Sequence, residues 1–165
     1  MFGLCVDGGV NGKTPKELVF LGIKSYKEQD FSKAKEYFKK ACDLNNSGGC
    51  GALGDLYYYG QGVEKNLTKA AQFYSKACDL KEGMGCSRLG RLYYYGEGVE
   101  KDLIKAAQFY TKACDLKDGK GCNNLAWLYR KGEGLEKDLI KAAQFYSKAC
   151  RLGVQEACEA LKGLK

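Results

Sequence analysis

The chain has 165 residues, with 27 lysines and arginines against 20 aspartates and glutamates and no histidine, so its formal net charge at pH 7 is +7. No apolar run approaches the ~20 residues that a membrane-spanning helix needs, so we expect a soluble protein without a membrane span. The lysines are spread over the chain without a block of like charge, which favours solvated helix faces over a nucleic-acid site or an anionic surface. We therefore expect no nucleic-acid partner.

Residues 1–13 differ from the rest of the chain. They begin apolar but lack the charged start and the full apolar region of a signal peptide, so we interpret them as an irregular segment or a signal-peptide remnant. With Gly12, Lys13 and Thr14, this segment nearly matches the motif of a phosphate-binding loop. However, Asp7 stands where the first glycine of that motif belongs. Cys5 is the odd cysteine, either unpaired or available to link two chains.

The first ordered elements are two helices. Thr14 and Glu17 have the spacing of a capping box with proline at the first helical position, so we expect a helix from Thr14 to about Gln29. Asp30 is suited to cap a second helix that reaches Leu44, because the apolar residues between them follow helical spacing.

The rest of the chain is an internal repeat. The stretch AAQFYSKACDL recurs at an interval of 36 residues, and so does a joint that reads YGQGVEKN, YGEGVEKD and KGEGLEKD. The glycines permit the turn, and Asn66, Asp102 and Asp138 are suited to cap the helices that follow. Helical spacing predicts a buried stripe in the third unit, formed by Leu103, Ala106, Ala107, Tyr110, Ala113 and Cys114. We expect one repeat domain over 14–165, with units 14–46, 47–82, 83–118 and 119–152 and a cap at 153–165.

Nine cysteines are a large excess for this length. Without histidine or a C-x-x-C spacing they do not resemble a zinc site, so we expect no metal and no other cofactor. A disulfide needs Cα atoms within about 7 Å, whereas residues eight apart on one helix lie about 12 Å apart. If Cys42 bonds Cys50, the chain must turn between them, and DLNNSGG supplies that turn. Such bonds persist in oxidising compartments, which predicts a secreted or periplasmic protein.

These features resemble a known family. Helix pairs with small residues at their crossings are similar to tetratricopeptide repeats, the joint YGxGVEKD with AAxFYxKAC resembles the Sel-like subclass, and C-x7-C in every unit resembles the Helicobacter cysteine-rich protein family, over about 15–165. The resemblance implies a right-handed α-solenoid in which each disulfide joins the second helix of one unit to the first helix of the next. The implied pairs are Cys42 with Cys50, Cys78 with Cys86, Cys114 with Cys122, and Cys150 with Cys158. It also implies export and, for several members, penicillin binding with weak β-lactamase activity.

The residues themselves support that enzymatic activity poorly. A serine β-lactamase needs S-x-x-K together with S-D-N and K-T-G elements. Ser32 and Lys35 fit S-x-x-K, but the helix is rich in lysine and the other elements are absent. A metallo-enzyme would need histidine ligands. Whether the chain is an enzyme stays open, with weak β-lactam hydrolysis as the alternative function.

A binding face has better support from the residues. When the copies are compared, the stripe positions barely change, while positions i, i+1, i+4 and i+8 of the first helix of each unit vary and share one face. In tetratricopeptide-like arrays this helix lines the concave groove, so we expect the face to bind an extended peptide, a protein or a peptidoglycan fragment, with a β-lactam as the alternative ligand. The alternative interpretation is that these positions are solvated and free to vary.

The predicted ligand-binding residues have distinct roles. The cations would hold carboxylates, the amides would bond a peptide backbone, and the indole would offer a flat apolar surface. These residues are Arg88, Arg91, Tyr95, Asn123, Asn124, Trp127 and Lys131. The recurring tyrosines Tyr57, Tyr58, Tyr93 and Tyr94 are assigned to packing instead.

Overall fold

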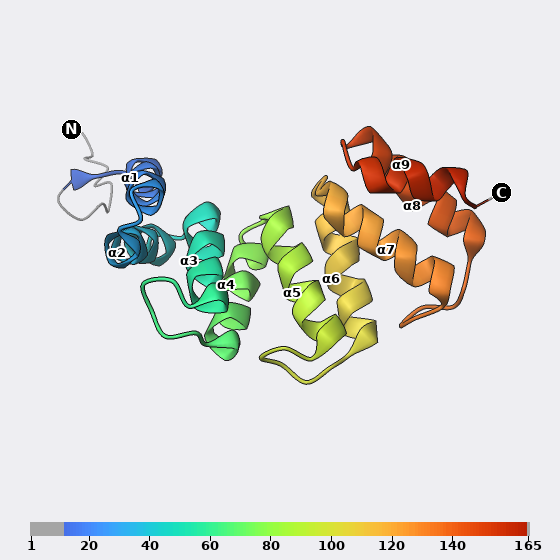
Figure 1. The fold of residues 1–165 in the computed structure, drawn as a ribbon, viewed down its shortest axis with the longest axis horizontal. Helices are drawn as coiled ribbons and strands as arrows, with labels where there is room; N and C mark the ends of the chain where they lie inside the picture. The colour runs from blue at the N-terminus through green and yellow to red at the C-terminus, as the bar shows by residue number, and fades with distance from the viewer. Residues whose placement is uncertain (1–11, 165) are drawn as a thin grey trace, which may run out of the picture. The chain divides into compact units, whose positions relative to one another are not determined.

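The computed structural model describes residues 12–164, and within this range it contains nine α-helices and no strand. Figure 1 labels the helices α1 to α9 in chain order. The interpretations of Cys5, of Asp7 and of a signal-peptide remnant fall outside the described residues. The chain divides after Leu80 into two compact units. The predicted all-α class, helix-turn-helix repeats with a C-terminal helix, is confirmed. Among the described helices, none combines the length and the apolar character needed to cross a membrane.

The first unit contains four helices: α1 (Pro15–Lys27), α2 (Phe31–Asp43), α3 (Ser47–Tyr59) and α4 (Leu67–Asp79). Successive helices pack on each other, and α1 also contacts α3. The core of this unit is built around Phe38 of α2, Leu53 and Leu56 of α3, and Ala77 of α4, all almost fully buried.

The second unit contains five helices: α5 (Gly83–Tyr95), α6 (Leu103–Asp115), α7 (Gly119–Lys131), α8 (Leu139–Arg151) and α9 (Gln155–Lys162). Successive helices again pack on each other, and α5 also contacts α7. The core combines the alanines of α6 and α8 with Leu125 and Leu128 of α7 and Ala157 of α9. The predicted stripe of α6 is confirmed for Ala106, Ala107, Tyr110, Ala113 and Cys114, whereas Leu103 is half-buried.

Side-chain caps begin the helices where the sequence predicts them. The Thr14 hydroxyl accepts the N–H of Glu17 at 3.2 Å, and an oxygen of the Asp30 carboxylate accepts the N–H of Lys33 at 3.1 Å. Asn66, Asp102 and Asp138 cap α4, α6 and α8 in the same way. The first helix ends at Lys27 and not at the predicted Gln29, because Gln29 has φ +62° and this left-handed conformation interrupts the helix.

The disulfides lie at the turn between one helix pair and the next. Within the units, bonds join Cys42 to Cys50, Cys114 to Cys122 and Cys150 to Cys158, with Cα atoms 4.5 to 4.8 Å apart. Cys78 and Cys86 are also disulfide-bonded. The turn in DLNNSGG is formed by Asn45, with φ +61°, and by Asn46, whose side chain accepts the N–H of Gly49 at 2.8 Å. This turn brings residues eight apart within disulfide distance.

Candidate functional site

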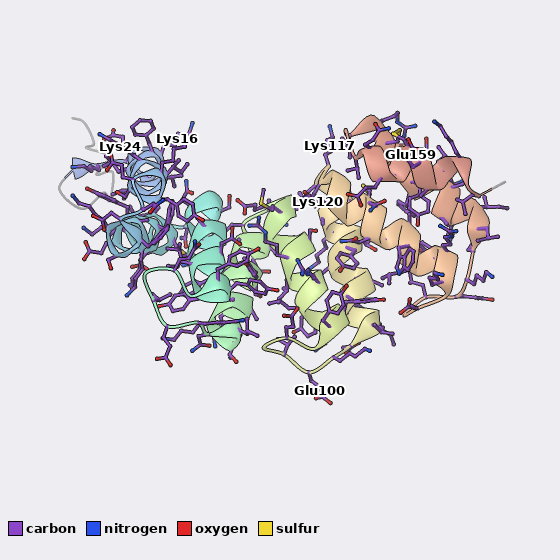
Figure 2. All side chains as sticks on the ribbon, in the orientation of Figure 1. Lys16, Lys24, Glu100, Lys117, Lys120 and Glu159 are labelled. Atoms are coloured by element: carbon purple, nitrogen blue, oxygen red, sulfur yellow. A yellow bond between two sulfur atoms is a disulfide. The ribbon has the colours of Figure 1, made fainter. Side chains whose placement is uncertain are left out.

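The residues of the predicted binding face lie on α5 and α7 of the second unit. Figure 2 shows the described side chains as sticks on the ribbon of Figure 1. On α5, Arg88 is half-buried, whereas Arg91 and Tyr95 are exposed. On α7, the two asparagines are half-buried, while the Trp127 side chain is 41% exposed. Because α5 and α7 are in contact, these side chains form one surface.

A cavity of about 570 Å³ opens on this surface. Its walls come from all five helices of the second unit, and α9 contributes Glu156 and Ala160. The other lining residues are Arg91, Tyr94, Tyr95, Tyr110, Asn123, Asn124, Trp127, Leu128, Arg130 and Tyr146. Five of the seven predicted residues therefore meet at one cavity, whereas Arg88 and Lys131 are not among its lining residues.

Two cation–aromatic pairs shape the rim of the cavity. The Lys131 Nζ lies 4.8 Å from the centroid of the Trp127 ring, and the Arg91 Cζ lies 5.8 Å from the centroid of the Tyr95 ring. Both distances are within the about 6 Å over which a cation is attracted to an aromatic face. Lys131 therefore lies over the indole that lines the cavity, while Arg91 lies over the Tyr95 ring and itself lines the cavity.

Two tyrosines form the floor of the cavity. Tyr110 of α6 and Tyr146 of α8 are only 4% and 2% exposed. Within residues 12–164 neither hydroxyl has a hydrogen-bond partner in the protein, and the described part of the chain holds no fully buried side-chain oxygen that lacks one. Both hydroxyls therefore open onto the cavity, which they line. Sequence reasoning placed Tyr110 in the buried stripe and missed this polar end.

Tyr94 is the other lining residue that the sequence assigned to packing only. Its hydroxyl donates to the Glu133 carboxylate, 3.1 Å from Oε2. Burial raises the pKa of Tyr94 above its ordinary value, and the hydrogen bond to Glu133 raises it further. The packing assignment does hold for Tyr57 and Tyr93, which stack on phenylalanines with ring centroids 5.5 Å apart.

The electrostatic character of the cavity is that of a hydrogen-bond donor site with excess positive charge. Burial holds the pKa of Tyr110 well above its usual range, with Tyr95 raising it and Arg91 lowering it to a smaller extent. The phenol therefore stays protonated and donates. The charged residues that line the cavity are Arg91, Arg130 and Glu156, and among the residues described neither guanidinium forms an ion pair.

Other chemistry has little support in the described part of the chain. There, no group of three or more histidine, cysteine or acidic side chains could hold a metal ion. Ser32 is exposed on α2, in the first unit, and no hydrogen bond to Lys35 is formed among the described residues. The S-x-x-K match therefore lies outside the unit that contains the cavity.

Comparison with known proteins places these features in a family. The Sel1 repeat family matches residues 18–46, 49–82, 83–118 and 119–154. Helicobacter pylori cysteine rich protein B has 38% identity, with a TM-score of 0.63 over 92% of this chain and 100% of that chain. A protective antigen of uropathogenic Escherichia coli, c5321, displays an SLR fold and has 28% identity and a TM-score of 0.83, over 93% of this chain and 33% of that chain.

Curated relatives match over shorter segments. HcpC of Helicobacter pylori strain J99 is 64% identical over 63 residues, which are 38% of this chain and 22% of that protein. HcpA of the same strain, named a beta-lactamase, is 50% identical over 63 residues, 38% of this chain and 25% of that protein. The matched part of the chain thus spans about a quarter or less of these relatives.

Proposed function

Because the chain belongs to the Sel1 repeat family and, within it, to the Helicobacter cysteine-rich proteins, we propose that it is an interaction module whose second unit binds an extended peptide segment of a partner protein. The observation that carries this proposal is the convergence of Arg91, Tyr95, Asn123, Asn124 and Trp127 on one cavity. If the variable positions were only solvated and free to vary, aromatic, amide and cationic side chains would not be expected to meet at one cavity.

The side chains of the cavity suit a peptide. Within residues 12–164, the amides of Asn123 and Asn124 have no hydrogen-bond partner, so each can donate to and accept from a peptide backbone. Trp127 offers an exposed apolar surface beside them, and tryptophan is enriched among the residues that dominate binding energy. A peptidoglycan fragment, which carries a short peptide, is the second ligand class that this chemistry suits.

Selection from a random peptide library tests this function. The full chain is immobilised, and random peptides displayed between two constant segments are selected on it. We expect an enriched pool, and we expect Trp127→Ala to weaken a selected peptide by at least about tenfold, because truncating a buried aromatic contact costs about 2 kcal/mol or more. Tyr59→Ala, an exposed aromatic of the first unit, is the control. Absence of an enriched pool, or equal binding by Trp127→Ala, would refute the proposal.

The four disulfides favour an oxidising environment outside the cytoplasm, and we propose that the protein is secreted or periplasmic. Mass spectrometry of protein from an oxidising compartment, alkylated before and after reduction, tests this compartment. We expect eight cysteines to be protected until reduction. Nine reactive thiols in the isolated protein would contradict it.

The name of HcpA raises β-lactam hydrolysis as the alternative function, and Ser32 with Lys35 is the sequence match that supports it. If this match is real, Ser32→Ala abolishes turnover of a chromogenic β-lactam and leaves peptide binding intact. Equal turnover by wild type and variant would exclude the serine mechanism.

A further inference from the structure

The first unit shows what an inward tyrosine of this repeat binds. Tyr74 of α4 is 2% exposed, and its hydroxyl donates to the Asp55 carboxylate of α3, 2.5 Å from Oδ1. Asp55 belongs to the variable face, at the i+4 position of its unit, whereas Tyr74 belongs to the buried stripe. In this unit the repeat therefore supplies its own carboxylate to the buried phenol.

The second unit keeps the tyrosine and loses the carboxylate. At 36-residue intervals, Tyr74 corresponds to Tyr110 and Tyr146, while Asp55 corresponds to Arg91 and Trp127. Among the residues described, the two hydroxyls have no partner in the protein, although Tyr110 and Tyr146 are themselves more than nine-tenths buried. The hydroxyl that is occupied in the first unit is thus open to the cavity in the second.

The groups around the Tyr110 hydroxyl define the chemistry of the missing partner. The Tyr110 hydroxyl is protonated and can donate at neutral pH, because the ordinary tyrosine pKa is about 10 and burial raises the pKa of Tyr110 further. Arg91 lines the same cavity as Tyr110. A phenol donor beside a guanidinium favours an acceptor with negative charge, because an ionised carboxylate is acceptor-only and forms short, strong hydrogen bonds with both groups. A neutral amide would satisfy the phenol but leave the positive charge uncompensated.

We infer that the cavity binds an acidic side chain of a peptide ligand, whose carboxylate lies between the Tyr110 hydroxyl and the Arg91 guanidinium and takes the place that the Asp55 carboxylate has in the first unit. A side chain suits this place better than a chain terminus. Lining residues on α5, α7 and α9 offer a peptide further contacts beside the two phenols, which favours a carboxylate with peptide on both sides of it. This inference rests on the proposed peptide binding and specifies its ligand.

The first test is the sequence preference of selected peptides. Two libraries are selected on the full chain, one with random peptides flanked on both sides and one with a free carboxyl end. We expect aspartate or glutamate to dominate one position of the flanked pool, and Tyr110→Phe and Arg91→Gln each to reduce that preference. A flanked pool without an acidic position, or enrichment only in the library with free carboxyl ends, would overturn the inference. Absence of any pool would instead reject peptide binding itself.

The second test measures the coupling between ligand and phenol. A selected peptide with blocked ends is compared by fluorescence anisotropy with its Glu→Gln or Asp→Asn counterpart. On the wild type we expect the amide to bind about tenfold more weakly or worse, since a hydrogen bond to a charged group is lost. On Tyr110→Phe this ratio should shrink. An unchanged ratio would contradict the inference.

A matched variant controls for indirect effects. Tyr74→Phe removes the corresponding hydroxyl in the first unit, where it is bound to Asp55, and should leave the peptide ratio at its wild-type value. We expect Tyr110→Phe to fold, because Phe38 occupies the corresponding position in the first repeat and is only 3% exposed there. If Tyr74→Phe reduced the ratio as much as Tyr110→Phe, the effect would be structural and the inference would be wrong.

Discussion

The two units use one helical repeat to different ends. In the first, the buried Tyr74 hydroxyl donates to Asp55, so the polar end of the stripe is satisfied within the protein. In the second, Arg91 and Trp127 stand at the corresponding positions, and the hydroxyls of Tyr110 and Tyr146 line a cavity of about 570 Å³. One position per repeat, occupied by Asp55, Arg91 and Trp127, therefore decides whether the buried phenol stabilises the fold or remains available to a ligand.

This difference shows how a repeat can vary its surface without changing its core. The tyrosine ring packs in the same way in both units: Gly54 faces the Tyr74 ring and Gly90 faces the Tyr110 ring. Because the ring is held by the helix crossing, the position opposite its hydroxyl can change from a carboxylate to a guanidinium at little cost to packing. Four experiments separate the two arrangements, in order of decreasing expected effect.

Removal of single disulfides should have the largest effect. A closed loop of about nine residues is worth about 2.5 kcal/mol in the chain-entropy model, so Cys42→Ser/Cys50→Ser and Cys150→Ser/Cys158→Ser should lower the unfolding free energy by similar amounts. Only the second pair anchors α9, which supplies Glu156 to the cavity. Peptide affinity, measured below the unfolding transition, should therefore fall in that variant alone. Equal affinity loss in both variants would contradict the assignment of the site to the second unit.

The helix crossings should show the next largest effect. A methyl group at Gly90 would lie 2.8 Å from the Tyr110 ring, and one at Gly54 would lie 2.7 Å from the Tyr74 ring. Overpacking of this kind costs about 1–3 kcal/mol, so both Gly→Ala variants should be destabilised in urea unfolding. Gly54→Ala should lose more, because displacement of its ring also strains the bond to Asp55.

Ala126, which occupies this register on α7 and is fully buried, provides the matched control for the crossings. Ala126→Gly introduces the glycine that the other two crossings have at Gly54 and Gly90. We expect this variant to leave a cavity beside the tyrosine ring and to cause no clash. A larger loss in Gly90→Ala than in Gly54→Ala would argue against the stabilising role of the Tyr74 hydroxyl.

Deletion of the hydroxyls tests the comparison directly. Tyr74→Phe should lower the unfolding free energy by about 1.5 kcal/mol, because it removes a hydrogen bond to a charged group. Tyr110→Phe should change it by less than about 0.5 kcal/mol, because no protein partner is left unpaired. Urea unfolding of the two variants measures the difference. Equal losses would mean that the Tyr110 hydroxyl is already satisfied within the protein.

Alkaline pH should reveal the smallest difference. The pKa of Tyr110 is raised in the folded state. The contribution of this shift to the unfolding free energy is therefore complete below the ordinary tyrosine pKa of about 10 and is lost as the pH rises above it. The loss contributed by one such tyrosine is at most about 1.4 kcal/mol per pH unit. Unfolding free energies at pH 8 and pH 10.5 should therefore differ less in Tyr110→Phe than in the wild type. Tyr59→Phe, at an exposed position, serves as the comparison, and an equal reduction there would contradict the expectation.

Much of the fold follows from local and periodic features of the sequence. The caps at Thr14, Asp30 and Asn66 depend on residues three positions apart, and the structure forms each of them. The interval of 36 residues predicted the helix pairs, because a fixed period repeats the same caps, turns and apolar spacing in each unit. The variable face could also be predicted from the sequence, since helical spacing alone places positions i, i+1, i+4 and i+8 on one side of a helix.

The composition of the cavity was decided by the tertiary structure. Periodicity identifies a face but not which atoms of neighbouring helices reach it: Arg91 lines the cavity and Arg88, three residues earlier, does not. The contribution of Glu156 comes from α9, and at 36-residue intervals before it the repeat has Lys120 and Met84, so the other copies predict no carboxylate at this position. The role of the Tyr110 and Tyr146 hydroxyls could not be predicted from the sequence. A buried tyrosine packs through its ring, and only the three-dimensional surroundings show whether its hydroxyl has a hydrogen-bond partner.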